Sequence, residues 1–323
     1  MRLPRKTSRS AFTLIELLIV IAIAAVLMAL AAGTYFRVRT VQLENATGVT
    51  LGKIGSQVDQ QFKAVSDQAK SDINDSKVPA AVRAMAGDDT IRVRVIWTKF
   101  HQKIQFPQNF WEVVVWAPAA EKNFGISQNP TYRLALNGIL PTDPNLIDPT
   151  RASPPFTAAE YEQLHNESAA LLYLALTQPR RGQGAGFNAV EHLGAHAVGE
   201  VTLFGRPFKV FQDTWRRPIA FVRWPFGSAG MDLQAPPFAT FAGGFILDPT
   251  DPERRLQVAS WQNAYGQAFI QSLNHPLTPL NLSPVIFSGG RDKLYGVDHF
   301  YTRLGSDEDD NIYGYRVRRA GGR

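Results

Sequence analysis

Two histidines with metal-ligand spacing are the first candidates for chemistry in this sequence. In "HLGAH", His192 and His196 are four residues apart, which would place them on one face of a helix, where they could hold zinc. Two ligands without an obvious carboxylate companion more often form a surface or core pair. The sequence has no His-Glu-x-x-His and no Gly-x-Ser-x-Gly motif. The absence of cysteine excludes thiolate sites and disulfides, and we predict no enzymatic activity.

A run of four acids at 307–310, "DEDD", is a second candidate site. Neighbouring carboxylates repel one another unless they are solvated or bind a cation. The spacing is not that of an EF-hand. Counted from Asp307, position six is Ile312 and position twelve is Arg318, where that motif needs glycine and glutamate. The run is therefore either a solvated loop or an irregular cation site.

The histidines and the acidic run both lie in the part of the chain that follows the N-terminal helix, which we expect to give the chain an α+β fold. Alternation of apolar residues with arginine in "TIRVRVIW" (90–97) predicts a half-buried strand, and "NFWEVVVWAP" (109–118) is a second strand candidate. Residues 208–225 predict two strands around a turn. The end of the chain, from 283, reads as a strand, a long loop and a strand. Thr157 and Glu160 form a capping-box pattern at the start of a strong helix.

The first part of the chain predicts one long helix. Leu17–Ala32 contains no charge, and with Phe12, Leu14 and Ile15 it reaches the roughly 20 residues that cross a bilayer core. An amphipathic stripe follows, with the spacing of one helix face. Its members are Ile54, Val58, Phe62, Val65, Ala69 and Ile73. We expect a helix over 12–75, transmembrane over 12–34, that packs its second half on an antiparallel sheet.

The charges at the start of the chain indicate a topology signal. Four basic residues precede the apolar run, and no acid accompanies them in residues 1–11. They carry most of the net charge of +6. Whole-chain charge is therefore no argument for a nucleic-acid surface.

Three readings of the apolar segment remain open because of Glu16. A secretory signal would be cut after the small residues of "ALAAG". A simple anchor would let Glu16 reach headgroup water, since a carboxylate inside the bilayer is costly. In the third reading, cleavage after Ala11 frees the amine of Phe12, and Glu16 pairs with that amine on a neighbouring subunit. This pairing would cancel two costly charges in lipid and fix the stagger between subunits.

The segment resembles the type IV pilin superfamily, which includes the pseudopilins of type II secretion. The likeness rests on "SRSAFTLIELLIVIAIAAVLMAL", in which a basic leader and a small residue precede Phe-Thr-Leu-Ile-Glu-Leu-Leu. The resemblance implies that a prepilin peptidase cuts between Ala11 and Phe12 and methylates the new amine. It implies that Glu16 guides assembly. Ala11 stands where the family usually has glycine.

The C-terminal half is similar to the major pseudopilins. Asp213, Trp215, Pro218 and Phe221 follow the pattern Asp-x-Trp-Gly-x-Pro with a later aromatic, and Arg216 replaces the glycine. "SGGRDKLYG" and "DEDDNIYGY" resemble the last loop and strand of those proteins. Because that loop binds calcium in the major pseudopilins, the resemblance implies a calcium site here. Its candidate ligands are Ser288, Asp292, Asp307, Asp309 and Asp310.

The resemblance also implies an organisation, a location and partners. Residues 1–11 would be a cytoplasmic leader, and 76–323 a periplasmic globular domain with a helical insertion at about 100–210. The chain would be a single-pass protein of the inner membrane and, once assembled, a subunit of a pseudopilus. Its partners would be the prepilin peptidase, other pilin-like subunits in a homo- or hetero-polymer, and the secretion platform with its cargo. The alternatives are a minor type IV pilin for adhesion or DNA uptake, although we do not expect a nucleic-acid partner, and a membrane-anchored enzyme with a pilin-like leader.

Overall fold

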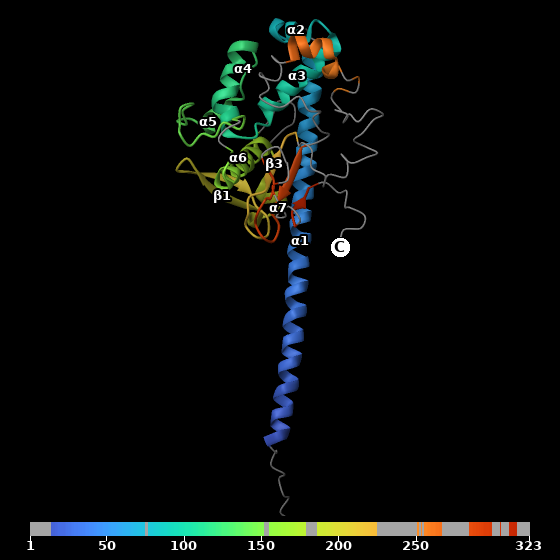
Figure 1. Cartoon of the computed structure of the whole chain (residues 1–323), viewed down its shortest axis with the longest axis vertical. Coiled ribbons are helices and arrows are strands. Elements are labelled where there is room, and N and C mark those ends of the chain that lie inside the picture. The colour runs from blue at the N-terminus through green and yellow to red at the C-terminus, as the bar shows by residue number, and fades with distance from the viewer. Residues whose placement is uncertain are drawn as a thin grey trace, which may run out of the picture. The chain divides into compact units, whose positions relative to one another are not determined.

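The computed structural model describes residues 14–74, 77–151, 155–178, 186–224, 251, 253, 255–266, 284–298, 304 and 310–314. The chain divides into two compact units, Met1–Asn45 and Ala46–Arg323. The helix α1, Leu14–Asn74, belongs to the first unit over its first half and to the second over its last part (Figure 1). The predicted long N-terminal helix is therefore confirmed.

The part of α1 in the second unit forms one side of the core. Its buried residues recur every three or four positions, as expected for one helix face. They are Thr47, Leu51, Ile54, Val58, Gln61, Val65, Ala69 and Asp72. Four members of the stripe read from the sequence are among them, whereas Phe62 and Ile73 are partly buried. The amphipathic stripe is thus confirmed.

Several helices follow α1 along the chain. They are α2 (Ala80–Ala86), α3 (Thr90–Gln105), a wider π-helical turn η1 (Glu112–Trp116) that continues into α4 (Ala117–Phe124), α5 (Pro130–Ala135), α6 (Ala158–Thr177) and α7 (Ala189–Leu193). The predicted capping box at the start of α6 is present. Thr157 accepts from the Glu160 backbone, and the Glu160 side chain accepts from Thr157 N.

The strands predicted at 90–97 and 109–118 are wrong, because both segments are helical. Asp89 caps α3, with its carboxylate accepting bonds from Ile91 N and Arg92 N at 3.0 Å. The alternation of arginine with apolar residues indicated an exposed face, but Arg92 is buried and donates to Ala86 O at 2.7 Å. The apolar positions 93, 96, 97, 100 and 104 recur at helical spacing, and the two-residue alternation over 90–97 concealed this pattern.

Two small antiparallel sheets complete the α+β fold. β1 (Val198–Leu203) pairs with β2 (Arg206–Phe211) as a hairpin. β3 (Ala220–Val222), β4 (Val285–Ser288) and β5 (Ile312–Tyr313) form a three-stranded sheet with β4 in the centre. The two strands expected in 208–225 and the final pair of strands are thus confirmed. Gly314, after β5, meets α1 closely: a Cβ there would collide with Ile286 and lie 3.2 Å from Leu51 O.

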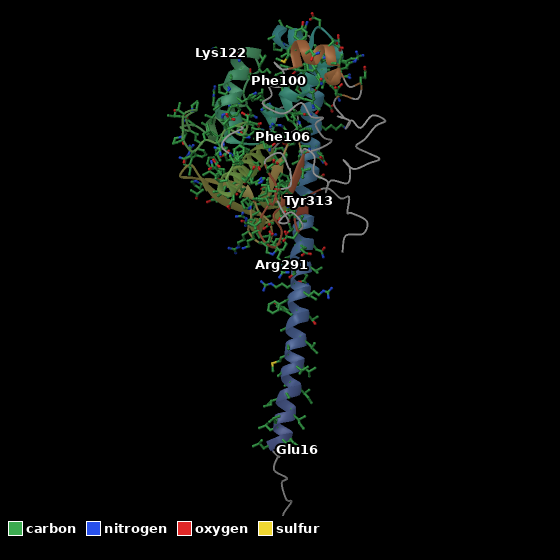
Figure 2. All side chains as sticks on the ribbon, viewed as in Figure 1. Glu16, Phe100, Phe106, Lys122, Arg291 and Tyr313 are labelled. Carbon is green, nitrogen blue, oxygen red and sulfur yellow. The ribbon has the colours of Figure 1, made fainter. Side chains whose placement is uncertain are left out.

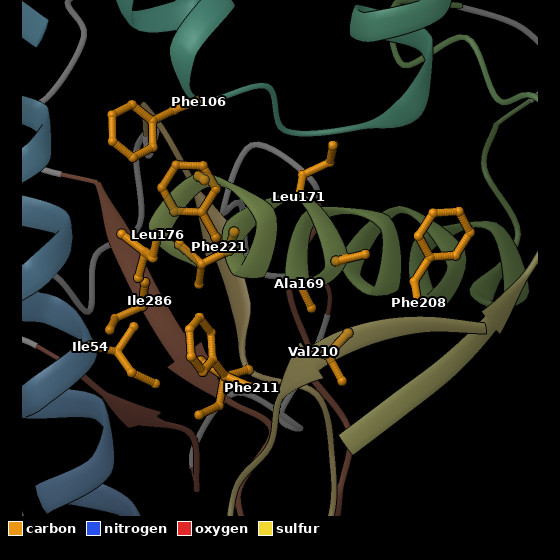
Figure 3. Packing of buried hydrophobic residues seen from close by; sticks show 14 of the residues in the cluster. Ile54, Phe106, Ala169, Leu171, Leu176, Phe208, Val210, Phe211, Phe221 and Ile286 are labelled. Carbon is orange, nitrogen blue, oxygen red and sulfur yellow. The ribbon is translucent and has the colours of Figure 1, made fainter. Parts of the chain in front are cut away.

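The largest hydrophobic cluster lies where α6 packs against the strands and α1. Figure 3 shows Ile54 of α1 facing Ile286 of β4, with Phe211 and Phe221 beside them. All four side chains are buried. Burial in this core explains why α6 is apolar on all sides over residues 169–176.

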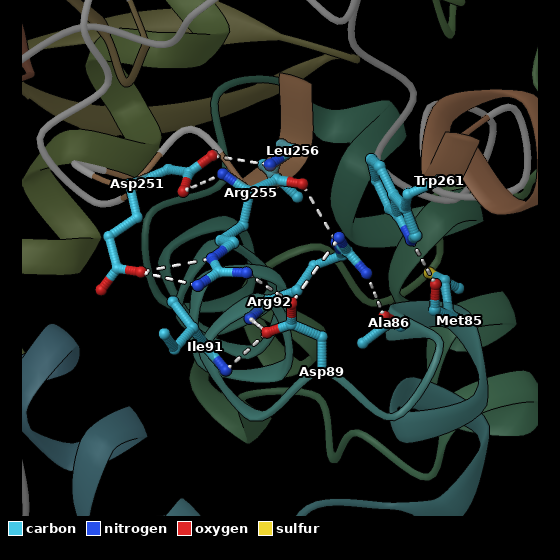
Figure 4. A network of polar contacts seen from close by, with 10 residues as sticks. Met85, Ala86, Asp89, Ile91, Arg92, Asp251, Arg255, Leu256 and Trp261 are labelled. Carbon is cyan, nitrogen blue, oxygen red and sulfur yellow. Dashed lines mark hydrogen bonds and ion pairs between the residues drawn. The ribbon is translucent and has the colours of Figure 1, made fainter. Parts of the chain in front are cut away.

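A second cluster joins α2–α4 to residues 251–266. That segment contains the short helices η3 (Arg255–Gln257), α8 (Ala259–Trp261) and η4 (Gln262–Gly266). Polar contacts hold it in place (Figure 4). Arg92 Nε donates to Arg255 O at 3.0 Å, Trp261 Nε1 donates to Met85 O at 2.9 Å, and Asp251 accepts from Arg255 N and Leu256 N.

Candidate functional site

Between Glu16 and Arg37, α1 exposes an apolar surface without a charged residue. Leu14 is 81% exposed, Ile19 is 50% exposed, and the large apolar residues between Ile15 and Leu30 show similar values. This helix is long and apolar enough to cross a membrane, and none of its most apolar window is buried. The segment therefore has the properties of a lipid-facing anchor.

Glu16 lies in the first turn of α1 and is exposed (Figure 2). A carboxylate at this end of a helix interacts favourably with the helix dipole. The other two processing and assembly residues, Ala11 and Phe12, lie outside the described residues, together with the leader. The structure thus places Glu16 at the start of the helix, beside the junction at which the sequence predicts cleavage.

The candidate calcium loop is described only in part. Asp310 accepts bonds from Arg291 N (2.8 Å) and Asp292 N (3.0 Å), so its carboxylate joins the two ends of the loop. Asp292 accepts from Leu294 N at 2.8 Å. Asp307 and Asp309 lie outside the described residues. Among the described residues, no group of three or more histidine and acidic side chains is placed to hold a metal.

Ser288, the remaining calcium candidate, is fully buried and bonds to Asp213. Its hydroxyl donates to Asp213 Oδ2 at 2.5 Å and accepts from Gly290 N at 3.1 Å. Asp213 also accepts from Trp215 N and Arg217 N. Burial raises the pKa of Asp213 above its ordinary value, although these bonds oppose the rise. Asp213 therefore ties β4 to the turn that follows β2.

That turn keeps a conformation that favours glycine. Arg216, which replaces the glycine of the pseudopilin pattern, has a φ of +63°. Its backbone N donates to Asp213 O at 3.1 Å. Left-handed backbone is unfavourable for a residue with a Cβ, so Arg216 adopts this conformation at a cost in strain.

The start of the loop after β4 is anchored to α6 as well. Tyr295 OH donates to Pro218 O at 2.6 Å, and His165 Nε2 lies 2.8 Å from Val297 O. The rings of His165 and Tyr295 are 4.6 Å apart. These contacts hold Tyr295 and Val297 in place.

The two histidines of "HLGAH" do not share a helix face. α7 ends at Leu193, and Gly194 has a φ of +87° before the next short turn begins. His192 Nδ1 lies 2.8 Å from Asn188 O. The zinc interpretation fails because the chain leaves the helix between the two residues.

The sequence analysis missed a buried ionic cluster. Glu112 bonds to Arg223 through two contacts of 2.8 Å, and Lys103 Nζ lies 3.2 Å from Glu112 Oε1. Burial would raise the pKa of Glu112, but the two cations outweigh it and lower that pKa to about 2. Burial lowers the pKa of Lys103 to about 8. The sequence feature that could have indicated this cluster is a single charged residue within each of two apolar runs, "NFWEVVVW" and "IAFVRWP".

A DNA-binding surface in this part of the chain would need Arg216, Arg217 and Arg223 to lie together on the surface. Arg223 is buried against Glu112, and Arg217 Nη1 pairs with Glu162 Oε1 at 3.0 Å. Only Arg216 of the three is exposed. These three residues therefore do not form a continuous basic stripe on the surface.

Comparison with known proteins identifies the class of the N-terminal segment. Residues 6–32 match the prokaryotic N-terminal methylation motif. The motif supports a type IV pilin-like precursor that is processed by a prepilin peptidase and anchored in a membrane. Proteins of this motif family have structural roles. No curated protein and no solved structure matches the chain.

Proposed function

We propose that the chain is a subunit of a type II secretion pseudopilus. The observation that carries the proposal is the methylation motif at 6–32, which runs directly into a continuous helix, Leu14–Asn74. A helix of this length can place its apolar half in lipid and its amphipathic half against a folded domain. That is the arrangement required of a subunit that leaves the membrane to enter a fibre.

In this proposal the peptidase removes residues 1–11 and methylates the amine of Phe12. Glu16 then pairs with the amine of a neighbouring subunit, which neutralises both charges in a medium where each is costly. The basic leader keeps the N-terminus cytoplasmic. The chain is single-pass, residues 76–323 are periplasmic, and the insertion at about 100–210 distinguishes it from shorter subunits.

The pseudopilin assignment, as opposed to a minor pilin, is supported by the turn after β2. Asp213 and Arg216 lie in this turn, and Arg216 has a positive φ, which glycine adopts most readily. This conformation supports the likeness to the Asp-x-Trp-Gly-x-Pro pattern. The strand, long loop and strand after Val285 fit the same resemblance. A DNA-uptake role is disfavoured because Arg223 is buried and Arg217 is paired.

Calcium belongs to this proposal as a ligand of the loop between β4 and β5. The site would draw on Ser288, Asp292, Asp307, Asp309 and Asp310. Calcium takes six to eight oxygen ligands in flexible geometry, and backbone carbonyls would have to supply several. The hydroxyl of Ser288 already bonds to Asp213 and Gly290, so the ion would depend mainly on the carboxylates.

Deleting the gene in the native host tests the proposed role. We expect proteins normally found in the medium to accumulate in the periplasm, with surface pili and DNA uptake unchanged. The wild-type gene should restore secretion, whereas Glu16→Leu should not, although the variant still inserts in the membrane and is cleaved. Normal secretion together with a loss of pili or DNA uptake would overturn the pseudopilus assignment in favour of a minor pilin.

A further inference from the structure

We propose that Tyr35, Phe36, Arg37 and Arg39 form a collar around α1 that binds lipid phosphate groups at the membrane face opposite the leader. The collar fixes how deeply the helix sits in the bilayer. This inference rests on the proposed membrane location and adds a lipid-binding surface to it.

The first observation is the match between the helix and the bilayer. Glu16 and Arg37 are about 21 residues apart, and no charged residue lies between them. At 1.5 Å per residue this is roughly 31 Å of helix. The hydrocarbon core of a typical bilayer is roughly 30 Å thick. With Glu16 at one boundary, Arg37 therefore lies at the other.

The second observation is that the collar residues lie on more than one side of the helix. Successive residues of an α-helix are about 100° apart, so Arg37 and Arg39 point in nearly opposite directions. Tyr35 and Phe36 are 61% and 63% exposed, and their rings pack edge to face at 5.8 Å. A single protein partner would contact one side of the helix, whereas a bilayer interface contacts every side. The distribution of the collar residues over more than one side of the helix therefore favours lipid over a single protein partner.

The chemistry of the collar suits a headgroup layer. The apolar part of an arginine side chain packs against the lipid acyl chains, and its planar guanidinium binds phosphate. Tyrosine places an apolar ring and a polar hydroxyl across the same boundary. Below the collar, Thr34 Oγ1 donates to Leu30 O at 2.9 Å, so this hydroxyl is satisfied within the helix. Polar groups that need water or phosphate thus begin at the collar.

Removal of the leader would make the collar more important. The leader contains four basic residues that hold the N-terminus on the cytoplasmic side. After the cut, Arg37 and Arg39 are the first basic side chains that remain on the helix. Sliding of the helix toward the cytoplasm would drag both into hydrocarbon, which is costly. Movement outward, into a fibre, brings no collar residue into hydrocarbon, and pairing with a neighbouring subunit would neutralise Glu16 and the new amine as they enter it. The collar therefore opposes movement in one direction only.

The absence of cysteine allows a direct test by depth measurement. Ala24→Cys and Ala32→Cys chains, each labelled with an environment-sensitive fluorophore, are reconstituted at low density in phosphatidylethanolamine–phosphatidylglycerol vesicles containing lipids brominated at defined depths. In the Ala32→Cys chain, Arg37→Gln with Arg39→Gln should move the probe deeper by about one helical turn, roughly 5 Å. The matched control is Arg83→Gln with Arg94→Gln, which removes the same charge from exposed sites in the second unit and should leave the depth unchanged.

The possible results distinguish a failure of the collar proposal from a failure of the proposed membrane location. Quenching of the Ala24 probe without any change at Ala32 in the double variant would overturn the collar and leave the location intact. A lack of quenching at Ala24 by any brominated lipid would overturn the location itself. A shift that appears only at high protein density would assign the arginines to a neighbouring subunit and overturn the lipid assignment.

Discussion

The buried carboxylate of Asp213 accepts a hydrogen bond from the Ser288 hydroxyl at 2.5 Å, which joins two segments 75 residues apart in the chain. Asp213 closes the turn after β2, and Ser288 ends β4, from which the candidate calcium loop departs. The same hydroxyl accepts from Gly290 N. One contact therefore fixes the turn after β2 and the start of the loop together.

Replacing Ser288 with alanine should destabilise the domain. The change leaves Asp213 Oδ2 and Gly290 N without the partner that each now has at the serine hydroxyl, in a buried place. A buried polar group that loses its partner costs about 1–3 kcal/mol. Denaturant unfolding of the full chain in detergent micelles measures the effect. Thr50→Ala is the control, because that hydroxyl bonds only to Ala46 O of its own helix. Equal effects of the two changes would contradict the account.

Replacing Arg216 with glycine should stabilise the domain. An L-residue in the left-handed region costs about 1–2 kcal/mol, and the extra backbone freedom of glycine in the unfolded chain offsets about 0.5–1 kcal/mol. We expect a net gain of up to about 1 kcal/mol in the same unfolding assay. Arg216→Ala removes the side chain but keeps the strain, so it should bring no gain. A loss of stability in the glycine variant would show that the arginine side chain itself supports the turn.

Glu167 should make stability depend on pH. It is completely buried on α6, where its carboxyl accepts from Phe110 N at 2.9 Å and from Gln163 Nε2 at 2.8 Å. Burial raises its pKa from 4.5 to about 7, against the effect of these two bonds. The folded chain thus keeps a proton that the unfolded chain releases. The resulting stability is fully present below pH 4.5 and is lost as the pH rises through about 7.

Glu167→Gln isolates this dependence, because the amide stays neutral at every pH. The span from 4.5 to about 7 corresponds to roughly 3 kcal/mol. Relative to the wild type, the variant should therefore gain most of that amount between pH 5 and pH 8. Glu121→Gln, at an exposed site, should show no such trend. A constant difference between Glu167→Gln and wild type across this range would mean that Glu167 is ionised throughout.

Calcium should stabilise the full chain in micelles if the loop binds it. The gain follows RT ln(1 + [L]/Kd), about 2.7 kcal/mol at one hundred times Kd. Magnesium should do less, because it requires a tighter octahedron of ligands. Asp307→Asn with Asp309→Asn should abolish the gain. These positions are preferable to Asp310, whose carboxylate already bonds to Arg291 N and Asp292 N. Identical melting in calcium and in chelator would show that the loop is only solvated.

Sequence patterns predicted the parts of the fold in which local signals agree with tertiary packing. The capping box at Thr157 and the stripe on α1 are examples. Prediction failed at α3, where alternating arginines suggested a strand. There, Arg92 can be buried because it donates hydrogen bonds to Ala86 O and to Arg255 O, which is 163 residues away. The sequence carries no local trace of such a contact.

Among the candidate sites too, those that depend on local spacing could be predicted from the sequence, whereas those that depend on contacts between distant residues could not. Glu16 and the predicted cleavage junction are recognisable because they depend on spacing between residues that are neighbours in the sequence. The Glu112–Arg223 pair is not, because its members are 111 residues apart and come together only when α3, η1 and β3 pack. Charges within apolar runs were the available signal, and they indicated burial without revealing the partner.

The mature N-terminus, determined by mass spectrometry of the protein purified from its host membrane, tests the central claim most directly. We expect a chain that begins at Phe12 with a methylated amine, because the end of the leader and the "AFTLIELL" junction lie within the matched motif. Glycine in place of Ala11 should be cut at the same bond. A mature chain that begins near Gly33, or one that keeps its leader intact, would contradict the pilin-like account.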